Sequence, residues 1–202
     1  MIETIRIKKG FDINLKGKAE KRIKEITPAK THAIKPTDFL GIKRPKLLVK
    51  EGDIVKAGTP ILFCKMHETV KYTSPVSGEI AEIVRGDKRK LLEVRILADR
   101  EIKYEEFKKY SISEINNLSR EAIAEILCET GVWPNILQRP YGIVADPKDE
   151  PRDIFVSGFD SSPLAPDFDF LFKGQEQYIQ TGIDVLNKFI SGMLRFDNRC
   201  QH

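Results

Sequence analysis

The sequence is poor in the residues that build metal sites and disulfide frameworks. Its 202 residues include only three cysteines, Cys64, Cys128 and Cys200, and one tryptophan. The cysteines lie too far apart for the spacings of zinc sites or iron–sulfur clusters. A run of about 18 apolar residues is also missing, which excludes a membrane-spanning helix. The chain is charged from its third residue, so we expect no signal peptide and a cytoplasmic location.

Charge is plentiful but unevenly distributed. With 41% hydrophobic and 32% charged residues the composition is that of a globular protein. The first fifty residues hold 14 lysines and arginines against 5 aspartates and glutamates, although the whole chain carries a net charge of only +4. Such a basic segment can face an anionic partner or membrane surface, or it can be an ordinary solvated surface. Aromatic residues do not alternate with the basic ones, which argues against a nucleic-acid partner.

Residues 1–99 consist of short apolar runs interrupted by glycine and proline, a pattern typical of strands and tight turns. Gly52–Asp53 is echoed 34 residues later by Gly86–Asp87, which predicts two half-repeats. Gly52 and Gly58 should adopt positive φ in turns, and the Asp53 side chain should bond to the backbone two residues on. Pro60 is expected to begin a strand, where its missing N–H does no harm.

Two motifs give this part of the chain a resemblance to the biotinyl/lipoyl carrier fold. They are G-D-I-V-K-A-G-T-P at Gly52–Pro60 and S-P-V-S-G at Ser74–Gly78. The resemblance implies a barrel-sandwich hybrid, a flattened sandwich of two similar halves. Carriers present a modified lysine on the hairpin between these motifs, but here the corresponding position is His67, and Lys65 lacks the neighbours that a ligase recognises. We therefore expect a scaffold, with covalent cofactor attachment as the alternative.

After Asp99 the sequence has mixed charge and few glycines and prolines, and helix signals follow. We predict a linker over residues 100–118 and a partial Rossmann-like α/β domain over 119–202. Ser119 can cap a helix with apolar positions at helical spacing, and Gly131 is placed to end it. A buried strand is expected at Ile154–Val156 and a second amphipathic helix at Gln175–Met193.

Taken in order, four segments resemble the NqrA family, one of the subunit families of the sodium-translocating NADH:quinone reductase: Ile5–Gly17, Val49–Phe63, Arg120–Gly142 and Ile154–Asp167. The tail from Met193 does not look like family sequence. The family's chains are more than twice this long. The resemblance therefore implies an N-terminal portion, and a truncated α/β layer should leave apolar faces for a partner to cover.

The resemblance implies a peripheral subunit on the cytoplasmic side of a complex that couples NADH oxidation by quinone to sodium export. Its role would be docking, near the integral quinone-reducing subunit. NADH, FAD, FMN, iron–sulfur centres and quinone would belong to the complex, with none bound by this chain. Sister families carry a glycine-rich flavin loop where this sequence has Val132, Trp133 and Pro134, which would crowd a phosphate. The alternative is a free carrier or adaptor protein.

A quinone could lie among aromatic side chains of the second region, with a polar group contacting its carbonyls. The candidates are Trp133, Tyr141, Phe155 and Phe159 for the ring, and Arg139 or Ser157 for the polar contact. The alternative is that the aromatic residues are core. We expect His32 and His67 to be solvated or locally hydrogen-bonded, with a role as ligand or base as the alternative. A nucleophile with its base cannot be assembled, so we expect no catalytic residue and no metal site in this chain.

Overall fold

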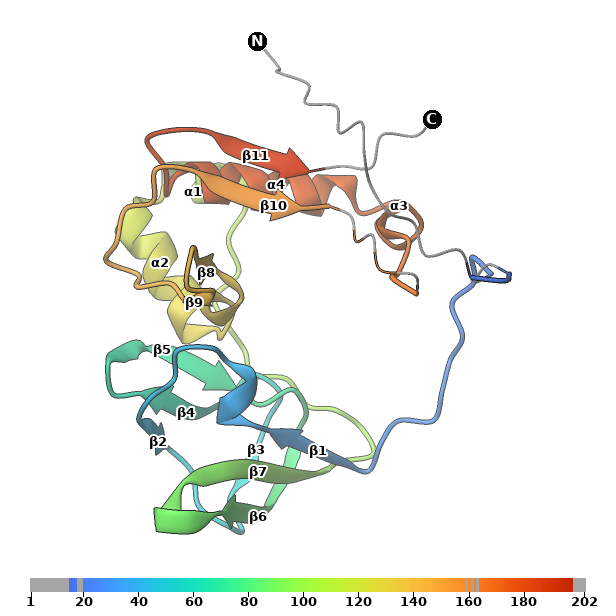
Figure 1. Ribbon diagram of the computed structural model, residues 1–202, viewed down its shortest axis with the longest axis vertical. Helices are drawn as coiled ribbons and strands as arrows, with labels where there is room; N and C mark the ends of the chain where they lie inside the picture. The colour runs from blue at the N-terminus through green and yellow to red at the C-terminus, as the bar shows by residue number, and fades with distance from the viewer. Residues whose placement is uncertain (1–14, 18–19, 159, 161, 163, 198–202) are drawn as a thin grey trace.

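The computed structural model describes residues 15–17, 20–158, 160, 162 and 164–197, and its N-terminal part is a β domain of two sheets (Figure 1). One sheet has the antiparallel order β1-β7-β6-β3 and the other the antiparallel order β2-β4-β5. The strands are β1 Thr31–Ile34, β2 Pro45–Leu47, β3 Ile54–Val55, β4 Pro60–Cys64, β5 His67–Thr73, β6 Gly78–Arg85 and β7 Leu91–Ala98, with short 3-10 turns η1 at Pro36–Asp38 and η2 at Asp87–Arg89.

The second region contains short helices and strands. They are α1 Ile112–Asn117, α2 Arg120–Glu129, the 3-10 turn η3 Trp133–Asn135, β8 Leu137–Gln138, β9 Ile143–Val144, β10 Ile154–Ser157, α3 Phe168–Leu171, α4 Glu176–Asn187 and β11 Leu194–Asp197. The predicted order, a β domain followed by an α/β region, is therefore present. Apolar residues of both parts form one core, because Ile61, Ile80 and Ile96 of the β domain belong to the same buried cluster as Ile123 and Trp133.

The turn chemistry of the first motif explains the entry into β4. Gly52 and Gly58 adopt φ of +86° and +102°, as predicted. The Asp53 carboxylate closes its turn differently from our expectation, because it accepts the Lys50 N–H at 2.9 Å rather than a donor two residues on. Pro60 is the first residue of β4, where a ladder donor is not needed.

The second motif, S-P-V-S-G, is a buried polar corner between the sheets. The Ser74 hydroxyl donates to the Val76 carbonyl at 2.6 Å. The Ser77 hydroxyl donates to Asp99 at 2.9 Å and accepts the Lys103 N–H at 2.9 Å. At Gly78 a Cβ would collide with the Leu97 carbonyl, so only glycine allows β6 to approach β7 here. The motif therefore serves packing and satisfies its own buried polar groups.

The two predicted half-repeats differ at their turns. Gly86 has φ of −98°, whereas the left-handed residues of the second turn are Lys88 at +52° and Arg89 at +60°. The Gly-Asp echo in the sequence therefore does not correspond to a repeated turn.

The segment predicted as a linker is fixed to the β domain at one end and folded at the other. Ala57 pairs with Tyr104 in a β-bridge, and the Thr59 hydroxyl donates to Glu105 at 3.2 Å. Ser111 then caps α1, with the Ser111 hydroxyl accepting the Glu114 N–H and the Glu114 carboxylate accepting the Ser111 N–H. The connection between the two regions is thus anchored along its length.

Helix α2 begins and ends where the sequence predicts. The Ser119 side chain accepts the Ala122 N–H at 3.2 Å, and Gly131 ends the helix region with φ of +76°. The same glycine lies so close to the Thr73 side chain that a Cβ would collide with it. Gly131 therefore both stops α2 and permits it to pack on β5.

The C-terminal part is a βαβ unit in which β10 and β11 are parallel and α4 packs beside them (Figure 1). Our prediction for the second helix was too long. It ends at Asn187, after which the chain turns through Lys188 and buries Phe189. At Gly192 a Cβ would collide with the Arg152 carbonyl, so this glycine lets the chain approach β10 before β11.

The strand predicted at Ile154–Val156 forms as β10, but the prediction that it is buried was wrong. Phe155 is 71% exposed, because among the described residues β10 pairs with β11 alone and one face of this two-stranded sheet is uncovered. Leu164, Tyr178 and Met193 add further exposed apolar surface, at 84%, 77% and 61%.

Candidate functional site

Trp133, the first candidate for a quinone contact, lies in the core. Its side chain is 3% exposed, and its indole N–H donates to the Ala145 carbonyl at 2.8 Å. The ring meets Phe189 edge-on, with centroids 5.5 Å apart. The single polar group of Trp133 is therefore committed within the protein, so this residue supports the surface above it and presents no donor to a ligand.

Arg139 and Tyr141 lie together on the turn of the β8–β9 hairpin. Both are exposed, Tyr141 by 75%. The turn is closed by the Gly142 N–H, which donates to the Gln138 carbonyl at 2.9 Å, and Gly142 itself is buried with φ of +64°. A short hairpin on the buried η3 segment thus presents one cation and one aromatic ring to solvent.

The remaining candidates belong to a different sheet. Phe155 and Ser157 alternate with half-buried residues along β10 and are exposed on one face. The Arg195 guanidinium of β11 lies 5.9 Å from the centre of the Phe155 ring. Phe159 lies outside the described residues. The structure therefore brings Arg139 and Tyr141 together and places Phe155 and Ser157 on a separate strand pair.

The segment that corresponds to the flavin loop of the sister families is folded on itself. The N–H groups of Val132, Asn135 and Ile136 donate to the carbonyls of Leu127, Val132 and Trp133. Pro134 has no N–H, and its ring is buried. Donors that a phosphate loop would direct at its ligand are thus used inside this segment.

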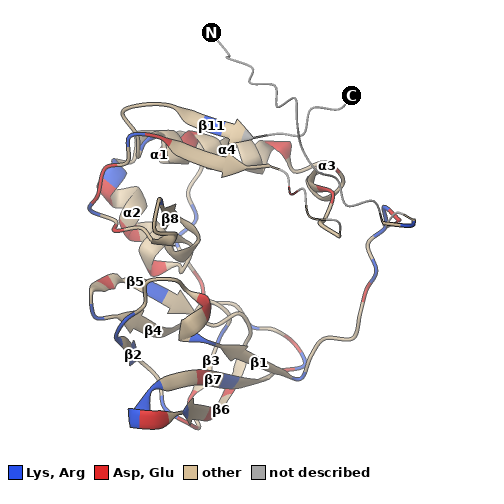
Figure 2. Cartoon of the chain, viewed as in Figure 1, with Lys and Arg blue, Asp and Glu red and all other residues tan. Residues whose placement is uncertain are grey.

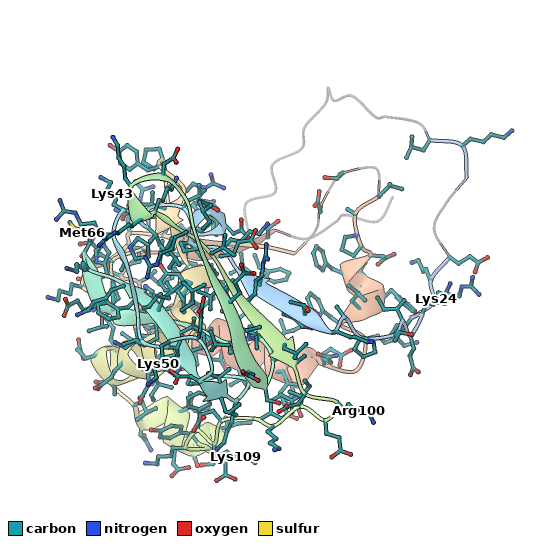
Figure 3. The ribbon with its side chains drawn as sticks, turned by 90° about the horizontal axis from the view of Figure 1, so that it is seen from below. Lys24, Lys43, Lys50, Met66, Arg100 and Lys109 are labelled. Carbon is teal, nitrogen blue, oxygen red and sulfur yellow. The ribbon has the colours of Figure 1, made fainter. Side chains whose placement is uncertain are left out.

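The carrier-like hairpin β4–β5 has Lys65 and Met66 at its tip. Both are exposed, and Figure 3 shows Met66 at the edge of the β domain. His67, the position that corresponds to the modified lysine of carriers, is instead the first residue of β5 and pairs with Cys64.

Strand β5 does not lie free, because its face is covered by α2 and η3. Cys128 on α2 is 3% exposed, and burial raises the pKa of its thiol to about 11 despite a hydrogen bond with Thr69 of β5. The His67 imidazole Nδ1 lies 3.4 Å from an Asp146 carboxylate oxygen. A neutral buried thiol and a histidine–carboxylate contact therefore join the two regions.

Sequence reasoning missed this interface. His67 and Asp146 are 79 positions apart and Thr69 and Cys128 are 59 positions apart, and neither pair belongs to a recognisable motif. Gly131 is the residue of this interface that carries a signal in the sequence. Its role as a helix stop was predicted, but its contact with Thr73 was not.

In the part of the chain that the structure describes, no group of three or more histidine, cysteine, aspartate or glutamate side chains could hold a metal ion. Among the same residues, no helix is long and apolar enough to cross a membrane.

Two family models match the chain in consecutive blocks. Residues 5–99 match the NqrA N-terminal barrel-sandwich hybrid domain, and residues 118–200 match the NqrA second alpha/beta domain. The chain belongs to the NqrA family. The resemblance stated from the sequence and the predicted fold class are both confirmed. The prediction that the tail from Met193 falls outside the family is wrong, because the second NqrA match runs to residue 200 and Leu194–Asp197 forms β11.

Curated relatives give the same assignment. The chain is 38% identical over 189 residues to the NqrA protein of the Na(+)-translocating NADH-quinone reductase of Alcanivorax borkumensis, and the match covers 93% of this chain and 42% of the relative. The NqrA protein of Pseudomonas aeruginosa is 35% identical over 184 residues, and that of Haemophilus influenzae is 36% identical over 184 residues, each match covering 91% of this chain and 41% of the relative. The chain thus spans about two fifths of the length of these NqrA proteins.

Proposed function

We propose that this NqrA chain contributes the first two NqrA domains to a Na(+)-translocating NADH–quinone reductase. The observation that carries the proposal is the match of both NqrA domains, in order, over nearly the whole chain. In this proposal the chain is a peripheral docking part on the cytoplasmic side that contacts the integral quinone-reducing subunit. NADH oxidation, flavin and iron–sulfur chemistry take place in other subunits, and this chain binds none of those cofactors.

The contacts of the β hairpin support a docking role. A carrier must release its hairpin to move between reaction centres, but here β5 packs on α2 through Thr69 and Cys128. The backbone N–H groups of Val132, Asn135 and Ile136 already donate to carbonyls of this chain, which also argues against a flavin phosphate bound to this segment. The carrier alternative would instead require a modified Lys65.

Within this role, we place quinone contact at the β8–β9 turn. Tyr141 offers an exposed flat ring on which a quinone headgroup can stack, and Arg139 offers guanidinium donors to a quinone carbonyl. Trp133 lies in η3, which contacts β9, and its indole N–H donates to the Ala145 carbonyl just after β9, so this residue supports the hairpin. A second protein of the complex would close the site, because one exposed hairpin cannot surround a ligand by itself.

The test uses the assembled complex. The tagged protein should co-purify in mild detergent with integral subunits of the reductase. In that complex, Arg139→Gln and Tyr141→Ser should each raise the KM for quinone about fivefold, which corresponds to about 1 kcal/mol of lost binding. Tyr178→Ser is the matched control, because Tyr178 is 77% exposed on α4 and Tyr141 is 75% exposed on its hairpin.

Two results would contradict the proposal at different levels. Equal KM values for the Tyr141 and Tyr178 variants would refute the quinone contact and leave the role within the complex standing. A protein that never associates with the integral subunits, and whose intact mass shows a lipoyl or biotinyl increment on Lys65, would establish the free carrier instead.

A further inference from the structure

A hollow of about 270 Å³ lies in the β domain, between the segment Pro36–Pro45 and the turn that joins β6 to β7. Its floor is apolar and includes Pro36 and Leu91, both buried. Its rim carries four basic residues from three segments and no acidic one, namely Lys43, Arg85, Arg89 and Lys90. Figure 3 shows Lys43 at the same end of the domain as the turn between the long strands β6 and β7.

Some bases elsewhere in the β domain, such as Arg95 and Lys35, form ion pairs with carboxylates. Arg95 on β7 forms ion pairs with Glu82 at 2.6 Å and Glu93 at 2.9 Å, and Lys35 lies 3.5 Å from Glu93. Within the described residues, by contrast, no rim side chain of the hollow forms an ion pair. Bringing like charges together without a partner is unfavourable, so the arrangement favours an anion from outside.

The backbone of the turn is strained in a way that keeps a base at the rim. Lys88 and Arg89 adopt φ of +52° and +60°, a left-handed conformation that turns usually assign to asparagine and glycine. The Arg89 carbonyl also accepts a hydrogen bond from the Arg85 guanidinium at 3.3 Å, which fixes Arg85 beside the hollow. Figure 2 shows basic residues at this hairpin end with acidic ones beside them, and Asp87 of the same turn does not line the hollow.

We propose that this hollow binds a phosphate group carried by a small ester. A guanidinium matches phosphate oxygens with paired donors, while lysines add charge without fixed geometry. The volume is just below the range of drug-sized ligand pockets, so it admits a phosphate with a small substituent on the apolar floor. Two sources share this chemistry, a soluble phosphate compound and the headgroup of an anionic phospholipid. The site is independent of the function proposed above.

The test compares two pairs of neighbours, each with one base on the rim and one outside it. Arg89→Gly removes a rim base, and Lys88→Gly removes the adjacent base with the same left-handed backbone. Lys43→Gln and Arg44→Gln form the second pair on a different segment. Neither glycine variant should lower the Tm, because relief of the left-handed strain offsets the flexibility that glycine adds. Loss of binding therefore cannot be ascribed to unfolding.

Binding is measured by calorimetry with pyrophosphate and by sedimentation with phosphatidylcholine vesicles that do or do not contain phosphatidylglycerol. Each rim variant should weaken binding about fivefold, and each outside variant should have little effect. If the rim variant of each pair binds pyrophosphate more weakly than the outside variant, the ligand is a soluble phosphate compound. If the two variants differ only in their binding to anionic vesicles, the ligand is a lipid headgroup. Absence of binding, or equal weakening by both members of each pair, would overturn the proposal.

Discussion

Lys188 provides the sharpest test of how the second region holds together. Its ammonium donates to three carbonyls at the end of α1, those of Ile115 at 2.9 Å, Asn116 at 2.8 Å and Leu118 at 2.9 Å. The Ile115 carbonyl also accepts the Leu118 N–H at 3.2 Å, and the ammonium lies at the negative end of the helix, where the last carbonyls lack intrahelical donors. Lys188→Met keeps the apolar stem and removes all three donors.

The expected loss follows from these contacts. One hydrogen bond from a charged donor contributes about 1.5–3 kcal/mol. Three bonds on one ammonium share a single desolvation cost, and the Asn116 contact is exposed to water. We therefore expect Lys188→Met to lower the free energy of unfolding by about 2–3 kcal/mol, which corresponds to a fall in Tm of about 4–12 °C for a chain of this length. Lys188→Arg should lose less, because a planar guanidinium can reach some but not all of the carbonyls.

Denaturant unfolding followed by circular dichroism measures the effect. Lys148→Met is the control, since the Lys148 side chain is exposed. A change below about 0.5 kcal/mol in Lys188→Met, equal to that of the control, is the size of an ordinary surface substitution. That result would refute the idea that Lys188 joins α4 to α1.

Two further predictions address the contacts between distant segments. Gly131→Ala should lower the free energy of unfolding by about 1 kcal/mol more than Gly174→Ala. Both glycines are left-handed, at +76° and +82°, but only at Gly131 would a Cβ collide with Thr73, and a smaller difference in denaturant midpoints would contradict this. Asp153 should make the stability of the β10–β11 pair depend on pH, because hydrogen bonds from the Met193 N–H and Arg152 lower the pKa of its carboxyl. A lowered pKa gives stability that is complete above the usual 3.8 and lost as the pH falls through the folded value. Asp153→Asn should therefore be less stable than the natural protein at pH 7 and equal to it in strong acid, as measured by denaturant midpoints, and a gap that persists in acid would contradict the assignment.

The sequence predicted elements whose signals are local. Positive φ at Gly52 and Gly58, the strand start at Pro60 and the cap at Ser119 each depend on a few neighbouring residues, and each is present. The end of α4 was mispredicted because apolar spacing continues past Asn187, while packing of Phe189 on Trp133 turns the chain away. A tertiary contact therefore sets the C-terminal end of α4, and the helix propensities of its residues do not indicate where it ends.

In the candidate site, too, local features follow from the sequence and contacts between distant segments do not. Arg139 and Tyr141 are close in sequence, and the structure keeps them together on one turn. Phe155 was grouped with them as another aromatic side chain of the second region, on a strand whose apolar run predicts burial. In the part of the chain that the structure describes, β10 has one neighbouring strand, so the Phe155 ring faces solvent on another part of the surface. The number of strands that will flank a given strand is a property of the assembled sheet, which spacing along the chain does not report.

The covered hairpin also sets an energetic limit on carrier activity. To release β5, the protein would have to expose Cys128, Ile123 and Ala124 of α2, which are buried in the core shared by both regions. Exposing one medium-sized apolar side chain costs about 1.5–3 kcal/mol, so the three together cost roughly 4 kcal/mol once the small alanine is discounted. A cost of that size holds the released form near one molecule in a thousand. A hairpin that is free so rarely cannot shuttle between reaction centres efficiently, whereas a fixed hairpin suits a surface that must keep one geometry against a partner.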